Sequence, residues 1–201
     1  MRIAEEHAAR VAGAAWQAIA SSGGPHATSL RHYPGALDRE LVSLLPLPSR
    51  GDLPPGQPAA LLDQESQPFE RHQAGPAIAG AYARRPRTVV LEDIGHGDPE
   101  GWAAIACTHL TRLSGSALPV TCSVYESRHG DEGLGEHRDA WAGVVVQAGG
   151  LKEWRLGGAV LGLRAGDVLI VPKWMPHAVG TPADPGWSVH LAFAIGREVP
   201  P

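Results

Sequence analysis

The second half of the chain restricts the possible folds more than any other part of the sequence. From Val120 onward, short β-type runs alternate with glycine-containing segments, and there is almost no helical pattern. Several short strands separated by turns are typical of an antiparallel sandwich or barrel. The expected strands span residues 120–125, 141–147, 151–156, 168–171 and 188–195. We therefore expect a mainly β fold in which the helices belong to the first half.

Helical patterns are confined to the region before residue 115. Apolar residues recur at helical spacing from Ile3 to Ile19, and a second short helix is expected over residues 37–45. Prolines between residues 46 and 58 exclude a helix or a central strand, because proline lacks a backbone donor. This passage is therefore expected to be a surface connection.

A third helix is expected after a short strand at residues 88–91. Asp98 would cap it, Pro99 would take its first position, and Gly115 would end it. We therefore divide the chain into a helical and proline-rich extension, residues 1–87, and a barrel, residues 88–201. The two parts are expected to form one structural domain.

Composition excludes several classes of function. The net charge is -4, and the densest basic group, Arg84, Arg85 and Arg87, is too small to neutralise a nucleic-acid backbone. Cys107 and Cys122 are too few for a disulfide framework or a cysteine-based zinc site, and we expect both to be buried thiols. The acidic first residues argue against a secretion signal, and no stretch is suited to span a bilayer. We expect a cytoplasmic protein with no nucleic-acid or membrane partner.

A His-x-Asp pair at the start of a strand predicts a metal site. Residues two apart on a strand point to the same face, so His137 and Asp139 would aim an imidazole and a carboxylate at one point. Two other pairs compete, at residues 96–98 and 129–131. The first lies at a helix cap and the second in a glycine-rich loop that does not fix side-chain directions. Only His137 and Asp139 lead directly into an apolar strand, and we favour them for this reason.

A third ligand and a cation would complete this site. His177 follows the expected strand at residues 168–171, where an antiparallel barrel can return the chain to the mouth at His137. Two histidines and one carboxylate leave open positions on Fe(II) for a bidentate 2-oxo acid and for O2. Lys152 follows residues 148–150, where we expect a turn that folds one strand back along the other. Its ammonium would then point into the barrel, although a solvated lysine is the alternative.

These residues resemble the cupin-like JmjC hydroxylases of the ribosomal-oxygenase type. The resemblance implies a double-stranded β-helix (jelly-roll, cupin/JmjC-like) barrel and an enzyme that uses Fe(II), 2-oxoglutarate and O2. It implies that His137, Asp139 and His177 ligate iron. It further implies that Lys152 and Tyr125 bind the distal carboxylate of 2-oxoglutarate. The similarity covers about residues 110–195 and includes 123–125, 133–139, Gln147, 150–154, Gly166, Asp167, Pro172, His177 and 188–191.

The chain departs from the family pattern in three places. Ser123 replaces a common asparagine, which leaves a shorter polar side chain beside the cosubstrate. Ala140 and Trp141 follow Asp139 and would reshape the substrate mouth. The sequence has no room after its last strands for the C-terminal winged-helix domain of the ribosomal oxygenases. We therefore expect the fold to carry over, but not their ribosomal-protein substrate.

The expected activity is hydroxylation of a C–H bond in an amino-acid side chain, with a peptide natural product as one option. The expected partners are a peptide, protein or small-molecule substrate, and a homodimer is allowed. Two other classes stay open: a metal-binding cupin with chemistry independent of 2-oxoglutarate, and a non-catalytic cupin-like binding module. Trp141 and Trp174 flank the ligand segments, where they would either line the substrate entrance or pack at the barrel rim.

Overall fold

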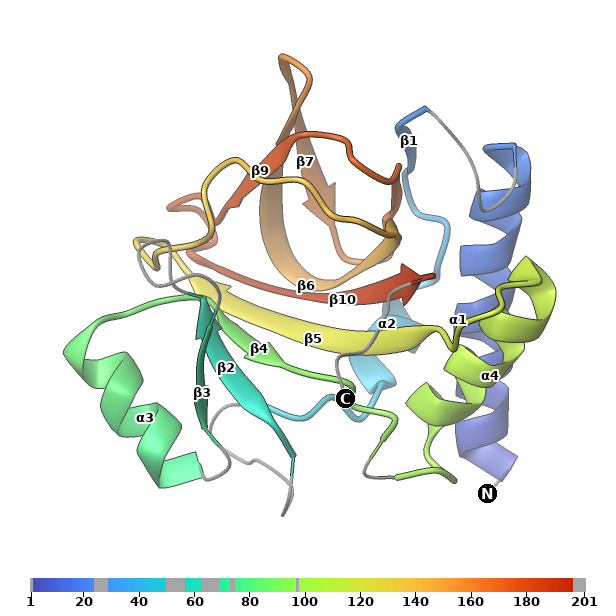
Figure 1. The fold of residues 1–201 in the computed structure, drawn as a ribbon, viewed down its shortest axis with the longest axis horizontal. Coiled ribbons are helices and arrows are strands. Elements are labelled where there is room, and N and C mark those ends of the chain that lie inside the picture. The colour runs from blue at the N-terminus through green and yellow to red at the C-terminus, as the bar shows by residue number, and fades with distance from the viewer. Residues whose placement is uncertain are drawn as a thin grey trace.

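The structure, a computed structural model, describes residues 2–23, 29–49, 57–62, 69–72, 75–96 and 98–196. Within these ranges the chain forms four helices and ten strands (Figure 1). The helices are α1 (Arg2–Ser21), α2 (Arg39–Leu44), α3 (Gly75–Arg84) and α4 (Trp102–Ser114). The strands are β1 (Arg31–Tyr33), β2 (Ala59–Leu62), β3 (Phe69–His72), β4 (Val89–Leu91), β5 (Thr121–Arg128), β6 (Ala142–Leu156), β7 (Ala159–Arg164), β8 (Val168–Val171), β9 (His177–Gly180) and β10 (Trp187–Ile195).

The longest strand, β6, joins the two layers of the barrel. Its first part, residues 142–150, pairs with β8 and β10, and its second part, residues 151–156, pairs with β7 and β9. The larger layer continues from β10 through β5, β4 and β2 to β3, while β1 pairs with β8 at the other side. All of these pairings are antiparallel. The predicted mainly β, antiparallel barrel is confirmed.

The turn expected at residues 148–150 is wrong, because β6 continues through it. The register against β10 shifts between Val189 and His190, which marks a β-bulge, and the strand bends there from one layer into the other. Gly150 has a φ of 63°, and a Cβ at this position would lie 2.0 Å from the Trp187 carbonyl oxygen. An Ala-Gly-Gly segment is compatible with either a hairpin turn or a bulge, so the sequence pattern alone did not separate them.

Alternation along the strands separates the helix-covered face of the larger layer from the barrel interior. Residues such as Val144, Val146 and Phe193 share one apolar cluster with α1, α2 and α4. Their neighbours Val145 and Leu169 point the other way and pack against Trp154 and other residues of the smaller layer. Because both faces are covered there, β8 and residues 144–146 of β6 are apolar at every position. Figure 1 shows α1 and α4 side by side at one end of this layer and α3 beside β2 and β3 at the other.

The first helix and the end of the third helix agree with the sequence predictions, but the start of the third helix and several other elements differ. Asp98 does not cap α4, which begins at Trp102 after the cap residue Gly101 and has no side-chain cap bond. Gly115 does end α4, with a φ of 63°. Strands β1, β2, β3, β7 and β9 and helix α3 were not predicted. The proline-rich passage falls partly on residues 50–56, which lie outside the described residues.

Cys107 and Cys122 are buried free thiols, as predicted. None of the helices in the described parts of the chain is both long and apolar enough to cross a membrane.

Candidate metal and cosubstrate site

Three of the predicted ligands meet at the mouth of the barrel. His137 and His177 form an antiparallel bridge in which each backbone N–H donates to the carbonyl oxygen of the other at 2.9 Å. This pairing places the two imidazoles beside each other, with ring centroids 4.2 Å apart. Asp139 Oδ2 lies 3.6 Å from His177 Nε2. One ligand atom from each of the three residues lies within 4.8 Å of the other two, which is close enough to share one metal ion.

Hydrogen bonds fix the tautomer of both histidines. His137 Nδ1 lies 3.1 Å from the carbonyl oxygen of Gly135, and His177 Nδ1 lies 2.9 Å from that of Met175. A carbonyl oxygen only accepts, so each Nδ1 carries the proton and each neutral ring keeps its Nε2 lone pair for a metal. Burial lowers the pKa of His177, and the neighbouring His137 adds to this effect. The neutral ring that a metal ion requires is therefore favoured.

The two competing His-x-Asp pairs do not form comparable groups. His129 is exposed, and Asp131 accepts hydrogen bonds from the Tyr82 hydroxyl and the Arg128 backbone N–H, both at 2.7 Å. Across the part of the chain that the structure describes, one group of three or more His, Cys, Asp or Glu side chains is arranged to hold a metal ion. It consists of His137, Asp139 and His177.

A cavity of about 110 Å³ extends from the three ligands into the barrel, and Lys152 lies on its wall. Lys152 is only 1 % exposed, and its ammonium donates to Ser127 Oγ at 2.6 Å and to Thr181 Oγ1 at 3.2 Å. Among the described residues, no carboxylate forms an ion pair with it. Burial lowers the pKa of Lys152 to about 8, although the charge of Asp131 partly opposes this effect. The cavity therefore contains a buried cation whose direct hydrogen-bond partners are neutral hydroxyl groups.

The predicted residues of β5 line the same cavity. Tyr125 stacks on His190, with ring centroids 4.8 Å apart and an angle of 6° between the planes. Ser123 also lies on the wall, and its hydroxyl accepts a hydrogen bond from the backbone N–H of Asp93 at 3.2 Å. Burial lowers the pKa of His190 well below its usual value, and the charge of Lys152 lowers it further. His190 is therefore a neutral ring on the cavity wall.

The two hydroxyl groups that hold Lys152, those of Ser127 and Thr181, were not predicted from the sequence. Ser127 follows Ser123 and Tyr125 at intervals of two on β5, so strand periodicity could have identified it. Thr181 lies in the loop after β9 and carried no recognisable signal. Its Oγ1 lies 2.6 Å from Ser127 Oγ, so the two hydroxyls and the ammonium form one buried hydrogen-bonded group.

Comparison with known proteins agrees with this architecture. The JmjC domain family matches residues 104–162, a segment that contains Ser123, Tyr125, His137, Asp139 and Lys152. No curated protein matches the chain in sequence. The predicted resemblance to JmjC proteins is therefore confirmed over this segment by the domain match, and the solved structures described next share the fold.

Solved structures of the ribosomal oxygenase YcfD from Escherichia coli are similar to this chain. One has a TM-score of 0.60 and 14% sequence identity, and the similarity covers 92% of this chain and 51% of that chain. A structure of YcfD with cobalt and 2-oxoglutarate has a TM-score of 0.54 and 16% identity, covering 86% and 49% of the two chains. A structure with cobalt and succinic acid has a TM-score of 0.53 and the same identity, covering 86% and 48%. The chain thus spans about half the length of these proteins, and the similarity shows a common fold.

Proposed function

We propose that this chain is an Fe(II)- and 2-oxoglutarate-dependent dioxygenase that hydroxylates a C–H bond in an amino-acid side chain of a peptide or protein. The observation that carries the proposal is the position of Lys152. A buried ammonium whose hydrogen-bond partners among the described residues are neutral hydroxyls lies in the same cavity as two histidines and one carboxylate. A dicarboxylate that reached from a metal ion to Lys152 would satisfy both ends of the cavity. YcfD, which shares the fold, has been crystallised with cobalt and 2-oxoglutarate.

The donor set fits Fe(II). Two imidazoles and one carboxylate on one side of a metal ion leave positions open for a bidentate 2-oxo acid and for O2. In the neutral form of each ring the Nε2 lone pair is available to a metal, because Nδ1 donates to a backbone carbonyl. The bound metal would supply the oxidation chemistry, which consumes 2-oxoglutarate and O2 and releases succinate and carbon dioxide.

The side chains of the chain itself bind and orient the reactants. Lys152, supported by Ser127 and Thr181, would hold the distal carboxylate through charge-assisted hydrogen bonds. Tyr125 and Ser123 would contact the same end of the cosubstrate. Apolar walls formed by residues such as Val145 and Trp154 exclude water from the cavity, which strengthens these electrostatic contacts.

Anaerobic titration tests this proposal. With Fe(II) bound, added 2-oxoglutarate should produce a metal-to-ligand charge-transfer band, and the band should be lost in His137→Ala and Asp139→Ala. His96→Ala is the matched control, because it removes an exposed histidine from a competing His-x-Asp pair and should leave the band unchanged. Fe(II) binding without the band would favour a cupin with different chemistry. Absence of Fe(II) binding would favour a non-catalytic binding module.

A further inference from the structure

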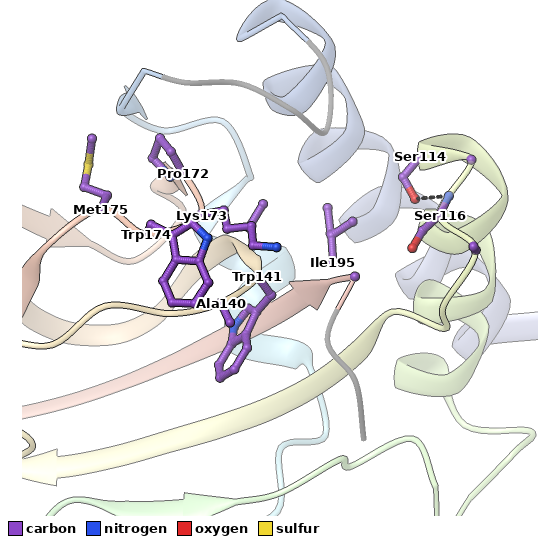
Figure 2. Close-up of a pocket in the computed structure, with 13 residues that line it drawn as sticks. Ser114, Ser116, Ala140, Trp141, Pro172, Lys173, Trp174, Met175 and Ile195 are labelled. Atoms are coloured by element: carbon purple, nitrogen blue, oxygen red, sulfur yellow. Dashed lines mark hydrogen bonds between the residues drawn. The ribbon is translucent and has the colours of Figure 1, made fainter. Parts of the chain in front are cut away.

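A second, larger hollow adjoins the metal site on the outside of the barrel. Its volume is about 580 Å³. We call it the tryptophan groove, and Figure 2 shows the residues that line it, including Trp141, Trp174 and Met175. Trp141 lines both this groove and the inner cavity, so the two spaces share a wall.

Both segments that carry the proposed metal ligands continue into the walls of the groove. Ala140 and Trp141 follow Asp139 directly, and Trp174 lies three residues before His177. The backbone N–H of Trp174 donates to the carbonyl oxygen of Asp139 at 2.8 Å, which ties the two segments together. A molecule in the groove would therefore lie against both ligand-bearing segments.

Trp174 has a conformation that is unfavourable for a tryptophan. It is the third residue of a turn closed by a hydrogen bond from the Met175 N–H to the Pro172 carbonyl oxygen, and its φ is 65°. Glycine is favoured where a turn needs a positive φ at this position. Strained backbone of this kind is often retained at functional sites. Here it holds an indole that is 55% exposed at the edge of the groove.

The form of the groove favours a peptide as its occupant. Pockets for small molecules usually enclose most of the ligand, whereas the exposed Trp174 shows that this groove is open to solvent. The inner cavity, at about 110 Å³, is much smaller than the groove. An extended chain can lie in an open groove and insert one slender side chain toward the metal. The exposed Trp174 and the half-buried Trp141, beside Met175 and Ile195, suit a bulky apolar group, and tryptophan is a frequent anchor of binding energy.

We propose that the tryptophan groove binds an extended peptide substrate and holds a large apolar or aromatic side chain against Trp141 and Trp174. The residue to be hydroxylated would lie close to this anchor in the peptide sequence and would enter the inner cavity. This inference rests on the proposed dioxygenase function and defines the substrate of that site.

A pool of random heptapeptides provides the test. The enzyme with Fe(II), 2-oxoglutarate and O2 should add one oxygen atom to peptides that carry a large apolar residue at a fixed spacing from the modified residue. Trp174→Gly removes the indole and relieves the strain, so it should fold normally. It should lower kcat/KM for the best peptide by about tenfold, through KM. Trp174→Phe, which keeps a ring, should recover part of this loss.

Leu44→Ala is the matched control. Leu44 is 61% exposed, lies at the end of α2 and does not line the groove. This variant should have unchanged kcat/KM, and all three variants should keep the charge-transfer band with 2-oxoglutarate. Absence of the band in the wild type would overturn the dioxygenase function itself. If the band forms but no peptide is modified, or if Trp174→Gly modifies the same peptides equally well, the proposal that the tryptophan groove binds a peptide substrate is wrong.

Discussion

Lys152 and Asp167 are two buried charges of the same barrel, and their surroundings differ in kind. Asp167 accepts hydrogen bonds from the backbone N–H groups of Gly35 and Arg164 at 2.9 and 3.0 Å, and His32 Nε2 lies 3.1 Å away. Burial would raise the pKa of Asp167, but these partners outweigh it and the pKa is lowered. In the part of the chain that the structure describes, Lys152 has two hydroxyl partners, and burial lowers its pKa to about 8.

This difference distinguishes Asp167, whose charge stabilises the fold, from Lys152, whose charge is available to a ligand. The partners of Asp167 stabilise its charged form, so this carboxylate joins β1 to the loop before β8. The partners of Lys152 leave its charged form less stable than it would be in water. A buried charge that the protein does not satisfy by itself is expected where a ligand of opposite charge completes the site.

The largest expected effect is that of Lys152→Met. The variant should lower the affinity for 2-oxoglutarate by about 100-fold, because a hydrogen-bonded ion pair with the distal carboxylate is lost. Methionine fits the volume of the lysine stem, and the buried charge is removed. The free energy of unfolding of the metal-free protein should therefore rise by roughly 1 to 3 kcal/mol. Calorimetric titration and urea unfolding would measure the two effects. A variant that is less stable than the wild type would show that the buried charge of Lys152 does not destabilise the metal-free protein.

Asp167→Asn should produce the opposite pattern. Loss of the charge weakens three contacts, and the amide must place a donor near groups that also donate. We expect the free energy of unfolding to fall by about 2 kcal/mol at neutral pH. The folded pKa of Asp167 is lowered, so its stabilisation is present above the unfolded pKa and is lost as pH falls through the folded value. The difference between wild type and variant in urea unfolding should shrink in acid, and 2-oxoglutarate affinity should not change.

The sequence pattern predicted the parts of the fold that follow from local periodicity. Strands β5, β8 and β10 were expected because their residues form short apolar runs between turns. Strands β1 and β2 were missed because their pairing with β8 and β4 depends on distant parts of the chain. The bend of β6 at Gly150 was also non-local, since it depends on the close approach of Trp187.

The candidate site likewise has parts that follow from local sequence patterns and parts that depend on distant contacts. His137 and Asp139 were selected by strand context, and the structure brings them together with His177 through a backbone pairing across about 40 residues of sequence. The burial of Lys152 was predicted from the wrong local structure, a hairpin, although a bend in one strand has the same effect. Thr181 could not be predicted, because a loop threonine acquires its role only when β9 is placed beside β6.

The affinity for 2-oxoglutarate should depend on pH in a way that distinguishes Lys152 from Asp167. Below pH 8 the ammonium of Lys152 is charged in the free protein, so the affinity should be constant there. Above that pH, binding must also add a proton to Lys152, and the affinity should fall by up to about tenfold per pH unit. Lys152→Arg stays charged throughout this range and should show no such fall. Calorimetric titration from neutral to moderately alkaline pH would compare the two proteins. An identical slope in both would assign the pH dependence to another group.

Thr181→Val should give the smallest effect. It tests how much the hydroxyl partners of Lys152 contribute to 2-oxoglutarate binding. Thr181 Oγ1 lies 3.2 Å from the ammonium, whereas Ser127 Oγ lies 2.6 Å away and is retained in the variant. Loss of the longer contact should weaken 2-oxoglutarate binding about threefold, because the shorter hydrogen bond still directs the ammonium. The pKa of Lys152 in the free protein should fall slightly, since its charged form loses one partner. The pH at which affinity begins to fall should move down with it. A variant with unchanged affinity and pH profile would leave Ser127 as the sole support of this cation.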